Sequence, residues 1–338
     1  MELTTVADDH AVVHEGLVVR RYDDLEPDTV YEYDGFVFRT LRRPPGELLC
    51  RVATVNDVHF GELECGVIEG MELGPTFSTE DGDEPYPELM NAGAIAEIER
   101  IDPAAVVVKG DLTSRGTTEE YDLFRSYYEP AFGDRLHVVR GNHDSYYGGT
   151  FAADVPVAVE LPGVVLAVLD TARLEHAAGQ VTPESLVWLR DQAAERAAAG
   201  DDRPILVFGH HHPWSPESGE RPEGYFGINP DDSERLIEVV AAHPNIRGYF
   251  CGHTHRNRVR RFSATRDVPW AEVASVKEFP GAWAEYRVFE GGILQVFHRI
   301  SSPECLVWTE KTRGMYAGMY FDYSFGALTD RCYEIAPA

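Results

Sequence analysis

The stretch Gly141-Asn142-His143-Asp144 decides the fold, and it directly follows the apolar run Leu136-His137-Val138-Val139. Asn and His are poor core residues, but an amide oxygen can bind a metal ion and an imidazole can carry a proton. Four other apolar runs end in similar groups, at Asn56-Asp57-Val58-His59, Lys109-Gly110-Asp111, Gly209-His210-His211-His212 and Gly252-His253-Thr254-His255. Because ligand sites in open α/β sheets lie at the carboxyl ends of strands, the pattern predicts an α/β fold with one shared site.

The composition is that of a globular protein. The 338 residues, 43% of them hydrophobic, allow one large domain or two small ones. No apolar run approaches the roughly 20 residues that span a bilayer, and no signal peptide is visible at the N-terminus. The five cysteines form no C-x-x-C pair. We therefore expect free thiols and a cytoplasmic location.

The chain is strongly acidic, with 57 acidic against 30 basic residues and a net charge of −27. Such a surface repels a nucleic-acid backbone and anionic lipid, so we expect neither nucleic acid nor a membrane as a partner. A small phosphate ester would be repelled as well, unless local positive charge draws it in. The sequence does not indicate an oligomeric state.

Residues 1–47 are predicted to form a β-rich N-terminal extension. Val30–Tyr33 and Phe36–Arg39 alternate around Asp34-Gly35, which is a strong hairpin signal. The segment resembles a trimmed fibronectin type III module, and a hairpin packed on the main domain is an equal alternative. Residues 48–338 are predicted to form that domain, with alternating strands and helices, a long loop from Gly61 to Pro87, and a β-rich, aromatic C-terminal part.

The five motifs read D-x-H, G-D, G-N-H-D, G-H-H-H-P and G-H-T-H, in this order. The order resembles the calcineurin-like metallophosphoesterase superfamily over roughly residues 50 to 257. The resemblance implies a four-layer α/β/β/α sandwich, formed by two packed sheets with helices outside. It also implies hydrolysis of a phosphate ester by hydroxide held on two metal ions.

The resemblance assigns a role to each motif residue. One ion is expected to bind Asp57, His59 and His255, and the other Asn142, His253 and a histidine of the 210–212 run, with Asp111 as the bridge. The ligand of relatives lies two residues before a proline, which indicates His211, since Pro213 follows. A mixed Asp, Asn and His set suits Mn, Fe or Zn. His143 is expected beside the phosphoryl group, where it can protonate the leaving oxygen or hold developing charge, and Asp144 is expected to orient His143 or to cap the following turn.

Two details narrow the expected activity. Ser114 stands where purple acid phosphatases have a tyrosine ligand of ferric iron. The run Gly110–Gly116, with Tyr121 a few residues on, looks like class III cyclic-nucleotide phosphodiesterases and related bacterial phosphodiesterases. We therefore expect hydrolysis of small phosphodiesters. The alternatives are a phosphomonoesterase, a nuclease, which the acidic charge disfavours, and a non-catalytic scaffold, which an intact ligand set disfavours.

Overall fold

Two six-stranded sheets form the centre of the computed structural model, which describes residues 1–68, 70, 73–153 and 155–337. The first sheet contains β10 (Leu136–Val139), β9 (Ala105–Lys109), β6 (Leu48–Val55), β17 (Ala282–Phe289), β18 (Gly292–Arg299) and β19 (Tyr333–Ile335), in this spatial order. Strands β10, β9 and β6 are parallel, whereas β17, β18 and β19 each pair antiparallel with their neighbours.

The second sheet contains β11 (Val157–Leu161), β12 (Val164–Val168), β13 (Ile205–Phe208), β14 (Ile246–Cys251), β16 (Trp270–Glu272) and β15 (Arg258–Arg260). Its four inner strands are parallel, and the two edge strands β11 and β15 are antiparallel to their neighbours. In both sheets, the parallel strands therefore direct their carboxyl ends to one side, which is where the polar motifs follow.

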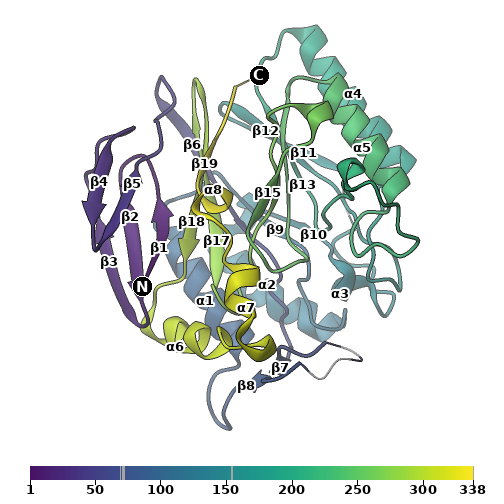
Figure 1. The fold of residues 1–338 in the computed structure, drawn as a ribbon. Helices are drawn as coiled ribbons and strands as arrows, with labels where there is room; N and C mark the ends of the chain where they lie inside the picture. Colours follow the sequence, from purple (N-terminus) through teal and green to yellow (C-terminus); the bar gives the residue numbers. More distant parts are fainter. Residues whose placement is uncertain (69, 71–72, 154, 338) are drawn as a thin grey trace.

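Three apolar cores separate four layers (Figure 1). Between the sheets, residues of both, such as Val107 of the first and Leu206 of the second, belong to one hydrophobic core. The outer face of the first sheet packs on α1 (Tyr86–Glu99), α2 (Thr118–Phe132) and α6 (Pro303–Thr312), and that of the second on α4 (Pro183–Ala199) and α5 (Pro230–Ala242). This arrangement confirms the predicted α/β/β/α sandwich.

Local signals explain several helix boundaries. Helix α4 begins with Pro183 in its first position and with the hydroxyl of Thr182 accepting a hydrogen bond from the Ser185 amide at 3.2 Å. The aromatic tail, which is the chain beyond Arg299, forms α6, α7 (Tyr320–Ser324), α8 (Leu328–Arg331) and β19. The long loop after β6 contains the short antiparallel pair β7 (Glu64–Cys65) and β8 (Phe77–Ser78). The short helix α3 spans Asn142–Ser145. No helix of the described residues is long and apolar enough to cross a bilayer.

The first 39 residues form two small sheets beside the first large one (Figure 1). Strands β1 (Glu2–Val6), β2 (Ala11–Glu15) and β3 (Val18–Tyr22) are antiparallel, and β4 (Val30–Tyr33) and β5 (Phe36–Arg39) form the predicted hairpin. Strand β1 lies against β18, where the Thr5 hydroxyl donates to the Phe297 carbonyl at 2.7 Å. The division of the chain at residue 47 stays a prediction.

Arg287 on β17 joins the N-terminal strands to the first sheet, since its Nη1 lies 2.7 Å from Asp8 Oδ1 and 2.8 Å from Asp9 Oδ1. Replacing it by Met would leave the buried Asp8 carboxylate without this cation, so Arg287→Met should destabilise the protein by about 3 kcal/mol in urea unfolding. The matched control is Arg42→Met, because the Arg42–Glu334 pair is exposed and should contribute less than about 1 kcal/mol. Equal losses in both variants would contradict this account.

Candidate metal centre

The five motifs meet at the carboxyl ends of β6, β9, β10, β13 and β14. In four of them, the second residue after the strand is a buried Asp or His: Asp57 follows Val55, Asp111 follows Lys109, His210 follows Phe208 and His253 follows Cys251. In the fifth, Asn142 is the third residue after Val139. Parallel strands in register end at the same edge of a sheet, so the loops that follow them lie close together. This explains why residues far apart in the sequence come together here.

One group contains Asp57, His59, Asp111 and His255, whose candidate ligand atoms all lie within 4.8 Å of one another. The Nε2 atom of His59 is 3.4 Å from Asp111 Oδ2, and that of His255 is 3.4 Å from Asp57 Oδ1. The structure thus brings together all the residues that the resemblance assigns to the first ion and the bridge.

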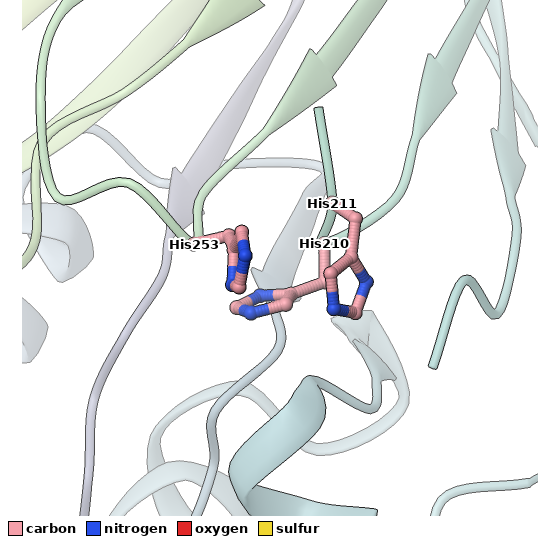
Figure 2. Close-up of side chains that lie close together, drawn as sticks. All are labelled: His210, His211 and His253. Atoms are coloured by element: carbon pink, nitrogen blue, oxygen red, sulfur yellow. The ribbon is translucent and has the colours of Figure 1, made fainter. Parts of the chain in front are cut away.

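The second group contains His210, His211 and His253, which lie within the same distance of one another (Figure 2). Asn142 belongs with them, because its Oδ1 lies 2.8 Å from His253 Nδ1 and 3.1 Å from His210 Nε2. The amide nitrogen of Asn142 donates to the Tyr146 hydroxyl at 2.8 Å, which directs Oδ1 toward the histidines. Three of the residues predicted for the second ion, Asn142, His211 and His253, are therefore neighbours.

His210 and His211 are the two residues of the 210–212 run that lie in the second group. The Nε2 atom of His210 lies 3.4 Å from Asp111 Oδ2, while its Nδ1 is held 2.8 Å from the Lys109 carbonyl. His211, the predicted ligand, has its Nδ1 3.0 Å from the Thr171 hydroxyl, and its buried Nε2 has no hydrogen-bond partner among the described residues. His210 therefore lies nearer the predicted bridge, whereas His211 offers the nitrogen without a partner, and both are candidates for the second ion.

The ligand loops have unusual backbone geometry. Five of the seven predicted ligands have a positive φ, with values of 54° at Asp57, 49° at His59, 51° at Asp111, 70° at His253 and 54° at His255. This left-handed conformation costs a residue other than glycine on the order of 1–2 kcal/mol. Such strain is typical of functional sites, where the surrounding structure imposes the backbone conformation.

Two glycines permit the close approach of these loops. A Cβ atom on Gly141 would overlap the carboxylate and backbone amide of Asp111, and one on Gly110 would overlap the His210 ring and the Gly141 amide. Gly110 also has a φ of 89°. The motifs G-D and G-N-H-D therefore need glycine at these positions because the loops after β9 and β10 touch there.

The electrostatics of the centre suit cation binding. Burial would raise the pKa of Asp111, but His210 and His143 outweigh it and hold the pKa well below the usual value. Burial would lower the pKa of His255, but the carboxylates of Glu278 and Asp57 raise it to about 10. Burial lowers the pKa of His59 to about 4. The buried carboxylates of the centre therefore lie beside imidazoles of two kinds. Some are protonated, such as that of His255, and others are neutral and free to bind a metal ion, such as that of His59.

The donor atoms fit two metal ions. Among the residues that the structure describes, the buried Nε2 atoms of His59, His211 and His253 have no hydrogen-bond partner. Buried polar atoms without a partner are rare in native proteins, and a metal ion bound to such nitrogen atoms would satisfy them. Asp57, His59 and His255 would hold one ion, and Asn142, His253 and His210 or His211 the other, with Asp111 between them.

His143 lies beside these groups without belonging to either. Its Nδ1 is 2.8 Å from the Ser114 carbonyl, and its ring centroid lies 4.4 Å from that of His59. A backbone carbonyl can only accept, so Nδ1 carries the proton in the neutral ring and Nε2 stays available. The His143 amide donates to Asp111 Oδ1 at 2.9 Å, which ties it to the predicted bridge.

Asp144 holds the loops after β9 and β10 together. Its carboxylate accepts from the amides of Gly141, Leu112 and Thr113 at 2.7, 3.0 and 2.9 Å. It therefore caps the turn that begins at Gly141, one of its two expected roles. Burial, together with the charge of Asp111, raises the pKa of Asp144 to about 6.

Comparisons with known proteins agree with this arrangement. A family profile described as Calcineurin-like phosphoesterase matches residues 50–257. The chain is similar to the glycerophosphodiester phosphodiesterase GpdQ of Enterobacter lignolyticus, with 27% identity over 235 residues, 64% of this chain and 76% of the relative. It is also similar to a probable cyclic nucleotide phosphodiesterase of Rhodococcus erythropolis, with 28% identity over 172 residues, 48% of this chain and about half of the relative (54%).

Among solved structures, a dimetal phosphatase from Danio rerio superposes with a TM-score of 0.57 at 13% identity. The superposition covers 75% of this chain and 97% of that one. At this identity, the likeness concerns the fold alone.

If Asp111 is the bridge, one carboxylate serves both ions, so Asp111→Asn should lose at least one metal ion per folded chain in elemental analysis. The control is Asp170→Asn, because Asp170 lies at another strand end but pairs with Arg140 at 2.5 Å. We expect this control to keep the wild-type metal content. An Asp111→Asn variant with unchanged metal content would contradict the bridging role.

His210 and His211 can be separated by the same measurement. His210→Ala should lower metal content more than His211→Ala, since His210 Nε2 is the imidazole nitrogen of the run that lies 3.4 Å from Asp111. His212→Ala serves as the control from the same run. If His211→Ala removes the metal and His210→Ala does not, the assignment based on the proline spacing is the correct one.

Proposed function

Because this chain belongs to the calcineurin-like phosphoesterase family, we propose that it is a dinuclear metal-dependent hydrolase of small phosphodiesters. The observation that carries the proposal is the position of Asp111, whose Oδ2 lies 3.4 Å from both His59 Nε2 and His210 Nε2. A carboxylate that faces two histidine groups is suited to bridge two ions that hold and activate one phosphoryl group.

The bound ions would supply Lewis acidity toward the phosphoryl oxygens and a lower pKa for an attacking water. The residues of the chain supply position and proton transfer. Asp57 and Asp111 provide negative charge that holds the ions, and the neutral imidazoles complete the sites. Mn, Fe and Zn all suit this donor set.

His143 is proposed to protonate the leaving oxygen. The Ser114 carbonyl keeps a proton on Nδ1, so a proton donated to the substrate would come from Nε2 of the imidazolium form. After transfer, the neutral ring keeps its bond to Ser114 and does not need to rotate. Ser114 would therefore contribute to the reaction through its backbone carbonyl, which orients His143. Its side chain does not supply the tyrosinate ligand that purple acid phosphatases have at this position.

A small diester fits the remaining observations better than a nucleic acid does. Both curated relatives are named as phosphodiesterases of small substrates, a glycerophosphodiester in one and a cyclic nucleotide in the other. A net charge of −27 opposes the counterion release that drives nucleic-acid binding. A phosphomonoesterase and a nuclease are therefore alternatives that the first experiment must exclude.

The first experiment is a substrate panel with added Mn²⁺, comparing bis-nitrophenyl phosphate, nitrophenyl phosphate, cyclic AMP, a glycerophosphodiester and single-stranded DNA. Hydrolysis of the small diesters with the highest kcat/KM would support the proposal, and chelation should abolish it. A preference for the monoester or for DNA would favour an alternative. A protein that binds metal but hydrolyses none of these substrates would agree with a scaffold role.

The role of His143 predicts a dependence on the leaving group. An alkoxide is a strong base and needs a proton, whereas a nitrophenolate does not. General-acid catalysis is worth about 10²–10⁴-fold, so His143→Ala should slow cyclic AMP or an alkyl diester by such a factor and bis-nitrophenyl phosphate far less. Metal content should remain unchanged. Equal slowing of both substrate types would mean that His143 stabilises the phosphoryl group and does not donate a proton.

A further inference from the structure

A buried charged group lies behind the first set of candidate ligands. It consists of Glu62, Lys277 and Glu278, which we call the Lys277 cluster. The Nζ atom of Lys277 lies 2.5 Å from Glu62 Oε2 and 3.1 Å from Glu278 Oε2. The side chains of Lys277 and Glu278 are only 4% and 3% exposed, and that of Glu62 is 18% exposed. Charges are rarely buried this deeply unless they have a function or a strict structural role.

The Lys277 cluster contacts the predicted ligands on the side away from the metal positions. Glu278 Oε1 makes a short hydrogen bond with His255 Nδ1, while His255 Nε2 faces Asp57 Oδ1 at 3.4 Å. Glu62 Oε2 lies 3.7 Å from His59 Nδ1, while His59 Nε2 faces Asp111 Oδ2. Both histidines thus have Nε2 directed into the centre and Nδ1 directed toward a carboxylate of this cluster.

This arrangement has a chemical consequence for His255. A histidine binds a metal through a deprotonated nitrogen, so the other nitrogen must carry the proton in the neutral ring. A carboxylate next to Nδ1 accepts that proton in a hydrogen bond, leaves Nε2 free, and makes the imidazole a better ligand. Lys277 anchors Glu278 in this position, since its Nζ lies 3.1 Å from the other carboxylate oxygen, Oε2.

Two further side chains, from distant parts of the chain, donate hydrogen bonds to the Glu278 carboxylate. The thiol of Cys65, in the long loop after β6, donates to Glu278 Oε2 at 2.9 Å. The hydroxyl of Tyr320, in the C-terminal helix α7, donates to Oε1 at 2.5 Å. Together with His255 and Lys277, these groups surround the carboxylate and leave it little freedom to turn away from the histidine.

From this geometry we infer that Glu278 is a positioning residue, anchored by Lys277, which accepts a hydrogen bond from His255 Nδ1 and so directs Nε2 toward the metal position. The inference rests on the proposed metal centre, and it concerns metal affinity, not the identity of the substrate. Glu62 faces His59 in a similar way, but its Oε2 lies 3.7 Å from His59 Nδ1, which is an ion-pair distance and not a hydrogen-bond distance.

The test is the affinity for Mn²⁺, measured by competition with a chelator. Glu278→Gln should weaken binding about 10–100-fold, which is the usual effect of removing such a partner of a ligating histidine, and Lys277→Met should act in the same direction. The matched control is Glu285→Gln, because Glu285 is equally buried and pairs with Arg51 and His298 at 2.9 and 3.0 Å, outside the candidate ligand groups. Unchanged affinity in Glu278→Gln would overturn the inference, as would an equal loss in the control.

A measurement on the unmutated protein keeps the inference testable if these variants do not fold. In the Zn²⁺-loaded protein, long-range ¹H–¹⁵N spectra should show His255 protonated at Nδ1 and not at Nε2. A proton on Nε2 would overturn the inference. The proposed function can fail without affecting this inference. A wild-type protein that binds Mn²⁺ tightly but hydrolyses no phosphodiester would refute the function, whereas the comparison of metal affinities between variants would still apply.

Discussion

The candidate centre depends on the position of one carboxylate, that of Asp111. Its Oδ2 faces His59 and His210 at 3.4 Å, and its Oδ1 accepts from the His143 amide at 2.9 Å. These contacts are possible because the loops after β9 and β10 approach so closely that Gly141 has no room for a Cβ atom. The approach follows from the parallel register of the two strands, in which Val139 pairs with Lys109, so that both loops begin at the same level of the sheet.

The charge distribution links the fold to the choice of substrate. The net charge of −27 repels a phosphodiester at long range, but surface charges are screened within about 8 Å at physiological salt. Two divalent ions would bring four positive charges to a centre where Asp57 and Asp111 supply two negative ones. An anion would therefore be attracted only close to the strand ends. Such a protein favours a small substrate that enters the centre over a long polyanion that must lie along the acidic surface.

The sequence was sufficient for features that depend on local patterns. Apolar runs that end in Asp, Asn or His indicated the strand ends, and Asp34-Gly35 indicated the hairpin. Within the run His210-His211-His212, the proline spacing indicated His211, and the structure brings both His210 and His211 into the second group, because the direction of adjacent side chains depends on how the backbone turns after β13. The Lys277 cluster gave no signal at all, since Glu62 and Lys277 are 215 residues apart and meet only through the sheet topology. The same reason explains why the role of the aromatic tail could not be derived.

The left-handed backbone of the candidate ligands gives the part of the chain beyond residue 257 a structural role. These loops are strained, so their shape must be imposed by neighbouring segments. The Asp57 loop is held by residues 273–276, since Asn56 Nδ2 donates to the Val273 carbonyl at 3.0 Å and the Val276 amide donates to the Asn56 carbonyl at 3.2 Å.

The loop that carries His253 and His255 is held by helix α7 in the same way. The Tyr323 hydroxyl donates to the Thr254 carbonyl at 2.9 Å, and the Asn257 amide donates to the Ser324 carbonyl at 2.9 Å. Residues 50–257, which match the family profile, contain every predicted ligand, but some of the contacts that hold two of the ligand loops come from beyond residue 257. The ligand-bearing part and the C-terminal part therefore form one structural unit, because contacts from the C-terminal part add to those that the ligand loops make with one another.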